Sequence, residues 1–325
     1  MIRRTVVAAL ALAGLTFAAL PAQAADYPSR TITMIVPYPA GGPTDQTARQ
    51  IAQSMSQTLK QTVIVENVSG GGTIIATNKV AKSAPDGYTL LLHNLQISAN
   101  VTLYKNLPFN TEKDLTPIIF VNSNPLVLVG RKTLEANDLK SLLADMKKTR
   151  MKAAIPGFGA TGHLATALLA QEDGAKVDMI PYRGAAPALT DILGGHVDLF
   201  FATPQSVVQQ VAVGQMKAYG ITSNDKVPEL PNVKSFVDVF GPKLKIQFWQ
   251  ALFAPAGTPQ PVIDKLNHAV QVAVSDPKLL AIWKKEGVSA YPKDEQTTAA
   301  ARKMMASEVA RWGKVIKDNN IHLDQ

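Results

Sequence analysis

The feature of this sequence that most constrains its fold is the regular alternation of strand-like and helix-like segments. The apolar run TITMIVP at residues 31–37 has the length of a buried strand, and apolar side chains then recur at helical spacing from Thr44 to Leu59. The same order returns at KAAI, residues 152–155, followed by a helix from about Thr161. Strands that alternate with helices form mostly parallel sheets with helices on both faces. The sequence therefore predicts an α/β protein, and its 325 residues favour two domains.

The remaining elements follow the same pattern along the chain. Further strands are expected at TVIVE, YTLLLH, VDMIPY, VDLFFA and MKAYGIT. Further helices are expected around residues 74–81, 139–148, 185–193, 207–211, 261–275, 278–286 and 295–317. Glycine- and proline-containing turns separate these segments.

The first two dozen residues have the pattern of a secretory signal peptide. Arg3 and Arg4 precede the apolar run TVVAALALAGLTFAAL, and AQA at residues 22–24 is a small-x-small cleavage sequence. The alternative, an N-terminal membrane helix, needs roughly 20 apolar residues and is disfavoured by length. We therefore expect residues 1–24 to be removed near Ala24 and the mature chain to be exported to the periplasm. The chain contains no cysteine, so its stability must come from its core and not from disulfides.

The net charge of +8 does not indicate a nucleic-acid partner. The lysines and arginines are scattered over predicted helix faces such as KSLLADMKKTR. Proteins that bind nucleic acids cluster these residues and combine them with aromatic side chains. Export also argues against such a partner.

The loop between the first strand and its helix, PYPAGGPTD, offers backbone N–H groups and few reactive side chains. The first N–H groups of a helix have no partner within it, and a helix start acts as roughly half a positive charge. Such a start binds carboxylate or phosphate groups. The candidate binding residues of this loop are Tyr38, Ala40, Gly41, Gly42, Thr44 and Asp45.

A second loop, PGFGATGH at residues 156–163, repeats this arrangement. Glycine allows an anion to approach the backbone closely, and the hydroxyl of Thr161 adds a donor. Two such loops, one in each domain, fit a ligand with two acidic ends or one acid held from both sides. The candidate binding residues of the second loop are Gly157, Gly159, Ala160, Thr161 and His163.

Each of these features also has a purely structural interpretation. A loop rich in proline and glycine can be no more than a turn. Asp45 can cap its helix, or it can face the ligand and favour one that carries an amine. His163 can bind a carboxylate, or it can serve as a structural donor at the start of its helix. The residues alone leave these alternatives open.

No catalytic constellation, cofactor site or metal site is predicted. Gly157, Gly159 and Gly162 match the spacing of a dinucleotide fingerprint, but the acid that should end the next strand is replaced by Asp178 at its beginning. No glycine loop is followed by the Lys and Ser/Thr of a P-loop, and the sequence contains no Gly-x-Ser-x-Gly elbow. The five histidines form no short ligand pair.

A series of motifs, in a fixed order, identifies a family resemblance. They are VPYPAGGPTDQTARQ, ENVSGGG, PDGYTLLL, YKNLPFN, HLATALL, VDMIPYRGAAPALTDILGGHVDLFF and WQALFAPAGTP. Together they resemble the periplasmic solute-binding proteins of tripartite tricarboxylate transporters, which are also called Bug receptors. The resemblance covers essentially the whole mature chain.

The resemblance implies a two-lobed type II periplasmic-binding-protein (flytrap) fold, in which each lobe is a mostly parallel sheet with helices on both faces. It implies that lobe 1 comprises residues 25–124 plus 250–325 and that lobe 2 comprises residues 125–249. Two strands would cross between the lobes, near residues 122–126 and 246–253. We expect a monomer.

The resemblance also implies a small carboxylate held by backbone amides of residues 38–45 and 157–163. It makes His93, Asn94 and Gln96, together with Tyr182 and Arg183, further candidates in the cleft between the lobes. Arg183 could pair with a carboxylate or only brace a loop. Many relatives carry an acid where this sequence has Ala202, and its absence disfavours an amino-acid ligand. Thr77 stands where the family usually has a glycine, which leaves the role of residues 70–72 open.

The function implied is that of a receptor that captures a di-, tri- or aromatic carboxylate in the periplasm and delivers it to the permease subunits of a tripartite tricarboxylate transporter. The chain is not expected to be an enzyme. Two alternatives stay open at this stage. One is an exported α/β enzyme that acts on a carboxylate, and the other is a ligand-loaded input to a periplasmic sensor.

Overall fold

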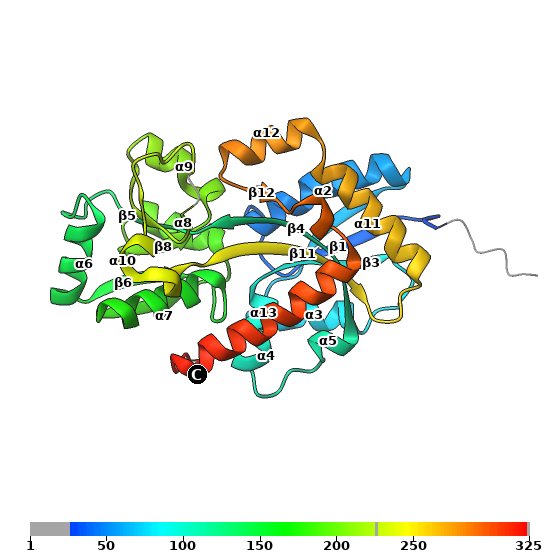
Figure 1. The fold of residues 1–325 in the computed structure, drawn as a ribbon, viewed down its shortest axis with the longest axis horizontal. Helices are drawn as coiled ribbons and strands as arrows, with labels where there is room; N and C mark the ends of the chain where they lie inside the picture. The colour runs from blue at the N-terminus through cyan, green and yellow to red at the C-terminus, as the bar shows by residue number, and fades with distance from the viewer. Residues whose placement is uncertain (1–26, 225–226, 324–325) are drawn as a thin grey trace, which may run out of the picture.

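The computed structural model describes residues 27–224 and 227–323. The predicted signal peptide and its cleavage site lie outside these residues. The described chain forms two six-stranded sheets, each with helices packed on it, and Figure 1 shows the two resulting lobes side by side. No helix in these two stretches is long and apolar enough to cross a membrane. The predicted two-lobed α/β class is confirmed.

The first lobe is built on a sheet with the strand order β12-β4-β11-β3-β1-β2. Met34 of β1 (Ile32–Val36) shares an apolar cluster with residues of α2 (Pro43–Leu59) and α11 (Gln260–Val274) on one face of the sheet. Ile35 shares a cluster with residues of α3 (Ile74–Ala81) and α13 (Thr298–Asp318) on the other face. The strands are β1 (Ile32–Val36), β2 (Val63–Asn67), β3 (Thr89–Asn94), β4 (Leu115–Pro125), β11 (Gln247–Pro255) and β12 (Ser289–Ala290). The helices are α2 (Pro43–Leu59), α3 (Ile74–Ala81), α4 (Gln96–Leu103), α5 (Thr111–Asp114), α11 (Gln260–Val274), α12 (Pro277–Lys285) and α13 (Thr298–Asp318).

The second lobe is built on a sheet with the strand order β10-β9-β5-β8-β6-β7. Side chains of the central strand β5 (Val127–Arg131) again alternate between the two faces of the sheet. Val129 shares an apolar cluster with α8 (Ala185–Leu193) and α9 (Pro204–Ala212), and Leu128 shares one with α6 (Leu139–Lys148) and α7 (Thr161–Asp173). The strands are β5 (Val127–Arg131), β6 (Met151–Ile155), β7 (Val177–Pro181), β8 (Leu199–Ala202), β9 (Met216–Ile221) and β10 (Lys234–Ser235). The helices are α6 (Leu139–Lys148), α7 (Thr161–Asp173), α8 (Ala185–Leu193), α9 (Pro204–Ala212) and α10 (Val237–Phe240).

Both sheets are mixed but mostly parallel, since four of the six strands run in one direction in the first lobe and five of six in the second. In the first lobe β1 pairs in parallel with β2 and β3, but β11 runs antiparallel to β3 and β4, and β12 runs antiparallel to β4. In the second lobe β5 runs antiparallel to β8 and β9. The antiparallel pairs involve the strands by which the chain leaves and re-enters a lobe. Such strands are not joined by the crossover helix that parallel neighbours require.

The two lobes are connected at the ends of β4 and β11. Strand β4 ends at Pro125 and β5 begins at Val127, so the chain passes from one sheet to the other within two residues. The buried hydroxyl of Thr222 accepts a hydrogen bond from Leu126 N at 2.9 Å and donates one to Ile246 O at 2.5 Å. This hydroxyl therefore ties the outgoing and the returning segment together at the boundary between the lobes.

The last long helix fixes the position of the returning strand. Glu308 of α13 is 8% exposed, and its Oε2 accepts hydrogen bonds from Trp249 Nε1 at 2.6 Å and Trp312 Nε1 at 3.0 Å. Trp249 belongs to β11, and its ring packs against Phe120 of β4 with centroids 4.6 Å apart. One carboxylate thus satisfies two buried indole N–H groups and attaches α13 to the crossing strands.

Glu308→Ala is expected to lower the free energy of unfolding by about 2–5 kcal/mol, because each buried indole N–H left without an acceptor costs ~1–3 kcal/mol. Asp318→Ala, on the same helix, is the matched control: it removes an exposed pair with Lys314 and should change stability by less than ~1 kcal/mol. Urea denaturation of the two variants and the parent chain measures both values. Equal midpoints for all three proteins would contradict the prediction.

Candidate ligand-binding site

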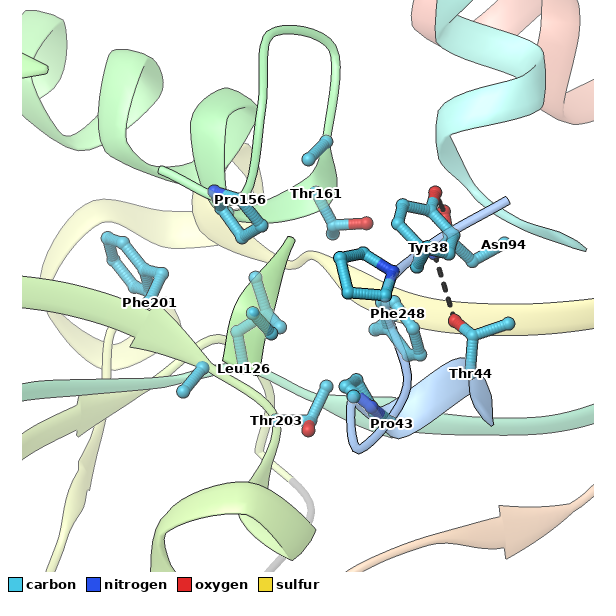
Figure 2. A pocket seen from close by; sticks show the side chains of 16 residues that line it. Tyr38, Pro43, Thr44, Asn94, Leu126, Pro156, Thr161, Phe201, Thr203 and Phe248 are labelled. Carbon is cyan, nitrogen blue, oxygen red and sulfur yellow. Dashed lines mark hydrogen bonds between the residues drawn. The ribbon is translucent and has the colours of Figure 1, made fainter. Parts of the chain in front are cut away.

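A pocket with about 510 Å³ of space between its atoms, including its opening to solvent, lies where the two lobes meet (Figure 2). The first lobe and the crossing strands contribute Tyr38, Pro39, Gly42, Pro43, Thr44, Asn94, Leu126 and Phe248 to its lining. The second lobe contributes Pro156, Ala160, Thr161, Gly162, Ala185, Phe201, Ala202 and Thr203.

Four helices of the described chain begin at this pocket. Residues 42–44 start α2, residues 160–162 start α7, Ala185 starts α8 and Thr203 is the N-cap of α9. None of these four helices has a side chain that caps its N–H groups. Among the other helices of the described chain, α5, α6, α12 and α13 are capped by the side chains of their own N-cap residues, whereas α3, α4, α10 and α11 are not. The pocket is therefore surrounded by N–H groups that have no partner within their helices, and these groups attract an anion.

The attraction for an anion comes from the backbone. Among the residues that line the pocket within the described stretches, none is Lys, Arg, His, Asp or Glu. A helix start contributes roughly half a positive charge, and its field is strong in a pocket with few waters. The arrangement can therefore bind a negatively charged group without a salt bridge.

Thr161 adds a hydroxyl that has no partner within the described chain. Its side chain is 3% exposed, and its Oγ1 is fully buried and makes no hydrogen bond. In Figure 2 this oxygen points across the pocket toward Tyr38 and Asn94. Because buried hydroxyls are nearly always hydrogen-bonded, an unpartnered one that faces a pocket indicates a ligand atom as its partner.

Thr44 supplies a second hydroxyl from the opposite lobe. Its Oγ1 accepts hydrogen bonds from Asn94 Nδ2 at 3.3 Å and from Gln250 Nε2 at 3.4 Å. A hydroxyl has two lone pairs and one proton, so these two bonds leave only the proton available. The two amides thus orient Thr44 as a donor, which suits an acceptor such as a carboxylate oxygen.

Tyr38 connects the first loop to the same network. Its hydroxyl lies 2.8 Å from Asn94 Oδ1 and 2.9 Å from Gln96 Oε1 and donates to this pair of oxygens. Burial raises the pKa of Tyr38, so the phenol stays protonated. Gln96 in turn donates from Nε2 to Phe158 O of the second lobe at 2.8 Å. A single chain of side chains therefore runs from the first loop to the second.

The two lobes are in contact around the pocket. Gln96 of the first lobe donates to the second lobe, and Gln205 of α9 in the second lobe donates from Nε2 to Pro43 O of the first lobe at 3.3 Å. Gly159 approaches α4 so closely that a Cβ on it would lie 2.8 Å from Asn100 Oδ1. Gly184 approaches Pro39 in the same way, because a Cβ on Gly184 would lie 2.9 Å from Pro39 Cδ. The structure is thus a closed arrangement, and these glycines provide the space for it.

The matches to known proteins agree with this geometry. The family described as "Tripartite tricarboxylate transporter family receptor" matches residues 47–321. The chain belongs to this family. The receptor is 38% identical over 310 residues to a UPF0065 protein in the TAR-I ttuE-ttuC' intergenic region of Agrobacterium vitis, with 94% of this chain and 89% of the relative covered.

Solved structures show the same similarity. The receptor resembles the periplasmic binding protein BugD with a TM-score of 0.87 and 36% identity, over 91% of this chain and 99% of BugD. It resembles MatC from Rhodopseudomonas palustris, whose structure contains bound malate, with a TM-score of 0.83 and 31% identity, over 89% of this chain and all of MatC. The family and these neighbours are binding proteins and not enzymes, as the sequence analysis expected for this chain.

The structure brings about half of the sequence-predicted site residues to the pocket of the receptor. Ala40 is exposed and does not line the pocket. The other predicted residues outside the pocket lining are Gly41, Asp45, Gly157, Gly159, His163, Tyr182 and Arg183. The predicted residues that line the pocket are Tyr38, Gly42, Thr44, Asn94, Ala160, Thr161 and Ala202.

Asp45 holds the first loop and does not face the pocket. Its carboxylate accepts hydrogen bonds from Gly41 N at 2.9 Å, from Arg49 Nε at 3.0 Å and from Asn67 Nδ2 at 3.0 Å. Burial alone would raise the pKa of Asp45, but these hydrogen bonds and the charge of Arg49 together hold it below its usual range. Asp45 is not the N-cap of α2 and does not line the pocket, and it accepts the N–H of Gly41 that the sequence analysis offered to the ligand.

His163 has an equivalent role in the second loop. Its Nδ1 accepts a hydrogen bond from Gly159 N at 3.1 Å, and its ring packs edge-on against Phe158 with centroids 5.5 Å apart. The N–H of Ala160 is bonded to Gly157 O at 3.2 Å. The side chain therefore shapes the loop, and the N–H groups at the start of α7, Thr161 and Gly162, are the ones that line the pocket.

Gly157, Tyr182 and Arg183 line a separate open groove between the lobes, together with residues 69–73. Tyr38 and Pro156 border both the groove and the pocket. Arg183 is exposed, and the hydroxyl of Tyr182 donates to Asp191 Oδ2 at 2.6 Å. These side chains therefore lie at the entrance to the cleft and not in the pocket.

The sequence analysis missed the apolar part of the lining. Pro39, Pro43 and Pro156 lie inside its loop motifs but were not among its candidate residues. Ala185 and Thr203 begin helices that were predicted without a link to the site. A search for helix starts in all βα loops would have found the last two. The missed lining residues are Pro39, Pro43, Leu126, Pro156, Gly162, Ala185, Phe201, Thr203 and Phe248.

His93 supports the pocket from behind. The ring is fully buried. Its Nδ1 accepts a hydrogen bond from Asn94 N at 2.7 Å, and its Nε2 lies 3.1 Å from Thr73 Oγ1. Burial lowers the pKa of His93 to about 3, despite a hydrogen bond with the backbone of Asn94 that opposes the shift. The ring is therefore neutral throughout the physiological range of pH.

His93 makes the stability of the receptor depend on pH. In the unfolded chain this histidine takes up a proton below its ordinary pKa of 6.5, whereas the folded protein does not bind that proton until about pH 3. The free energy of unfolding should therefore fall with decreasing pH between these values, by up to ~1.4 kcal/mol per pH unit. Urea denaturation at pH 7.5 and 5.0 should show a smaller difference for His93→Gln than for the parent. His268→Gln, at an exposed position, is the control that should keep the parent's difference.

Thr161→Val should weaken the binding of a carboxylate roughly ten- to a hundredfold, because a hydrogen bond to a charged group contributes ~1.5–3 kcal/mol. The free protein should be as stable as the parent or more stable, since the hydroxyl has no partner there. Thr166→Val, one turn further along α7, is the matched control, because Thr166 Oγ1 donates to Gly162 O and does not line the pocket. Isothermal titration calorimetry checks the affinities, and equal affinities for the two variants would contradict the assignment of Thr161.

Proposed function

We propose that this receptor captures a small organic carboxylate in the periplasm and delivers it to the permease subunits of a tripartite tricarboxylate transporter. The observation that carries the proposal is the convergence of four uncapped helix starts on one pocket without charged side chains. A carboxylate there would accept hydrogen bonds from the N–H groups of α2 and α7 and from the hydroxyls of Thr44 and Thr161. The malate bound to MatC, a structural neighbour of the same family, supports this class of ligand.

We further propose that the receptor works as a flytrap with lobe 1 at residues 25–124 plus 250–325 and lobe 2 at residues 125–249. Both boundaries fall near the segments tied together by Thr222, where few residues need to change conformation. The opposing donors, Thr44 on one lobe and Thr161 on the other, reach a common carboxylate only when the lobes are closed. Opening and closing would then follow ligand binding.

The export of the receptor is part of the same proposal. Family members are periplasmic binding proteins, and the N-terminal sequence supports cleavage near Ala24. We propose that the mature chain is a monomer. The competing idea of an exported enzyme lacks a His, Lys, Asp or Glu among the pocket-lining residues of the described chain that could act as the base for a threonine or tyrosine hydroxyl. A receptor returns its ligand unchanged, which separates the two ideas experimentally.

A thermal-shift screen tests the proposal. The mature chain is unfolded in guanidinium chloride and refolded to remove any co-purified ligand, and is then heated with di-, tri- and aromatic carboxylates and with the corresponding neutral amides. A true ligand at 100 times its dissociation constant stabilises the folded state by ~2.7 kcal/mol, which raises the melting temperature by several degrees. The proposal fails if no acid shifts the melting temperature, or if the amides shift it as much as the acids do.

A further inference from the structure

We propose that the ligand of the receptor has a single carboxylate and an otherwise apolar body, such as a benzoate-like aromatic acid or a short aliphatic monocarboxylate. This inference rests on the proposed function, since it takes the pocket to be a carboxylate site, and it narrows the class of acid. It follows from the way polar and apolar groups are separated within the pocket.

The side chains that can bind a carboxylate lie at one end. Figure 2 shows Tyr38, Asn94 and Thr44 together on one side, and the hydroxyl of Thr161 points toward them from the other lobe. Both hydroxyls are buried, at 2% exposure for Thr44 and 3% for Thr161. One has only its proton available, and the other has no partner in the described chain. This end provides the donors for one carboxylate.

The opposite end of the pocket is apolar. In Figure 2, Phe201, Leu126 and Pro156 lie on the side of the pocket away from Thr44 and Asn94, whereas Phe248 lies beside Thr44. Phe201 and Leu126 are each 2% exposed, and the ring of Phe201 packs against Phe236 with centroids 5.6 Å apart. These side chains are held in place by the core of the second lobe. They can exclude water around a ring or an alkyl chain.

The apolar end offers few donors to a second acid. Thr203 Oγ1 lies 3.0 Å from Ser206 Oγ and shares one hydrogen bond with it in which either hydroxyl can donate, so Thr203 supplies at most one donor to the pocket. Pro204 in the first turn of α9 and Pro187 in the first turn of α8 each remove one N–H donor, as Pro43 does in α2, whereas α7 has no proline in its first turn. Ser206 N is already bonded to Thr203 O at 3.0 Å.

A second carboxylate placed among these groups would lose its water and gain few hydrogen bonds. Burial of an ionised group without a partner is strongly unfavourable, so such a ligand would bind weakly or leave its second acid outside the pocket. Arg183, in the adjoining groove, is exposed and separated from the pocket by Tyr38 and Pro156. The geometry therefore favours a monocarboxylate over a diacid of the same length.

Matched pairs of acids test this inference. Isothermal titration calorimetry with the refolded receptor compares benzoate with terephthalate and hexanoate with adipate, so that each pair differs by one carboxylate. Benzamide serves as the uncharged counterpart of benzoate. We expect at least one monocarboxylate to bind tenfold or more tightly than its diacid partner, and benzamide to bind at least tenfold more weakly than benzoate.

The outcomes separate this inference from the proposed function. If both diacids bind as tightly as their monocarboxylate partners, or if only di- and tricarboxylates bind, the inference is wrong while the carboxylate receptor stands. If benzamide binds as tightly as benzoate, or if no carboxylate binds, the proposed function itself is wrong.

Two variants assign the preference to the two ends of the pocket. Leu126→Gln places an amide at the apolar end and should reduce the preference for the monocarboxylate at least fivefold. Thr161→Val should weaken both members of a pair to the same extent and leave their ratio unchanged. Urea denaturation of each variant verifies that it is folded. If Leu126→Gln does not fold, the wild-type pairs still decide the inference, and an unchanged ratio in folded Leu126→Gln would contradict the assignment of the apolar end.

Discussion

The candidate site depends on the N–H groups at the starts of four helices, which have no side-chain cap and lie around one pocket. In most helices the first N–H groups are satisfied by a side-chain cap or by water, and a buried helix end without such partners is unfavourable. Here α2, α7, α8 and α9 all begin uncapped around the same pocket. Because each follows a strand of its sheet, the α/β architecture itself brings these helix starts to facing edges of the two lobes. The fold thus creates a positive electrostatic potential that a bound anion can neutralise.

The charged and titratable residues of the two loops serve this arrangement indirectly. Asp45 binds Gly41 N, Arg49 and Asn67, and His163 binds Gly159 N. Each therefore fixes the path of a loop while leaving the following helix start open. Since these side chains are already hydrogen-bonded within their own lobes, little reorganisation is needed when an anion enters, and affinity increases when less order has to be imposed on binding.

The sequence could predict the elements but only part of the site. Alternation of apolar residues is local, so helices such as Ile74–Ala81 and Ala185–Leu193 were predicted with their observed bounds. Helix α4 was missed because its buried face is largely polar and contacts the second-lobe loop through Gln96 and Asn100. Gly159 was interpreted as room for an anion, whereas it provides room for Asn100 of the other lobe. Contacts of this kind depend on how the lobes meet, and no local pattern encodes that.

The division of the donors between the lobes has a consequence for closure. A ligand changes the balance between open and closed forms only by as much as its affinity for the two forms differs. If all donors lay on one lobe, a carboxylate would bind the open form nearly as well and closure would gain nothing. Thr44 and Asn94 belong to the first lobe and Thr161 to the second, and the lobes also meet through the hydrogen bonds Gln96–Phe158 and Gln205–Pro43 and the close approach of Gly184 to Pro39. In the function proposed above, the carboxylate would complete the interface between the lobes, so that binding and closure would be coupled through the same hydrogen bonds.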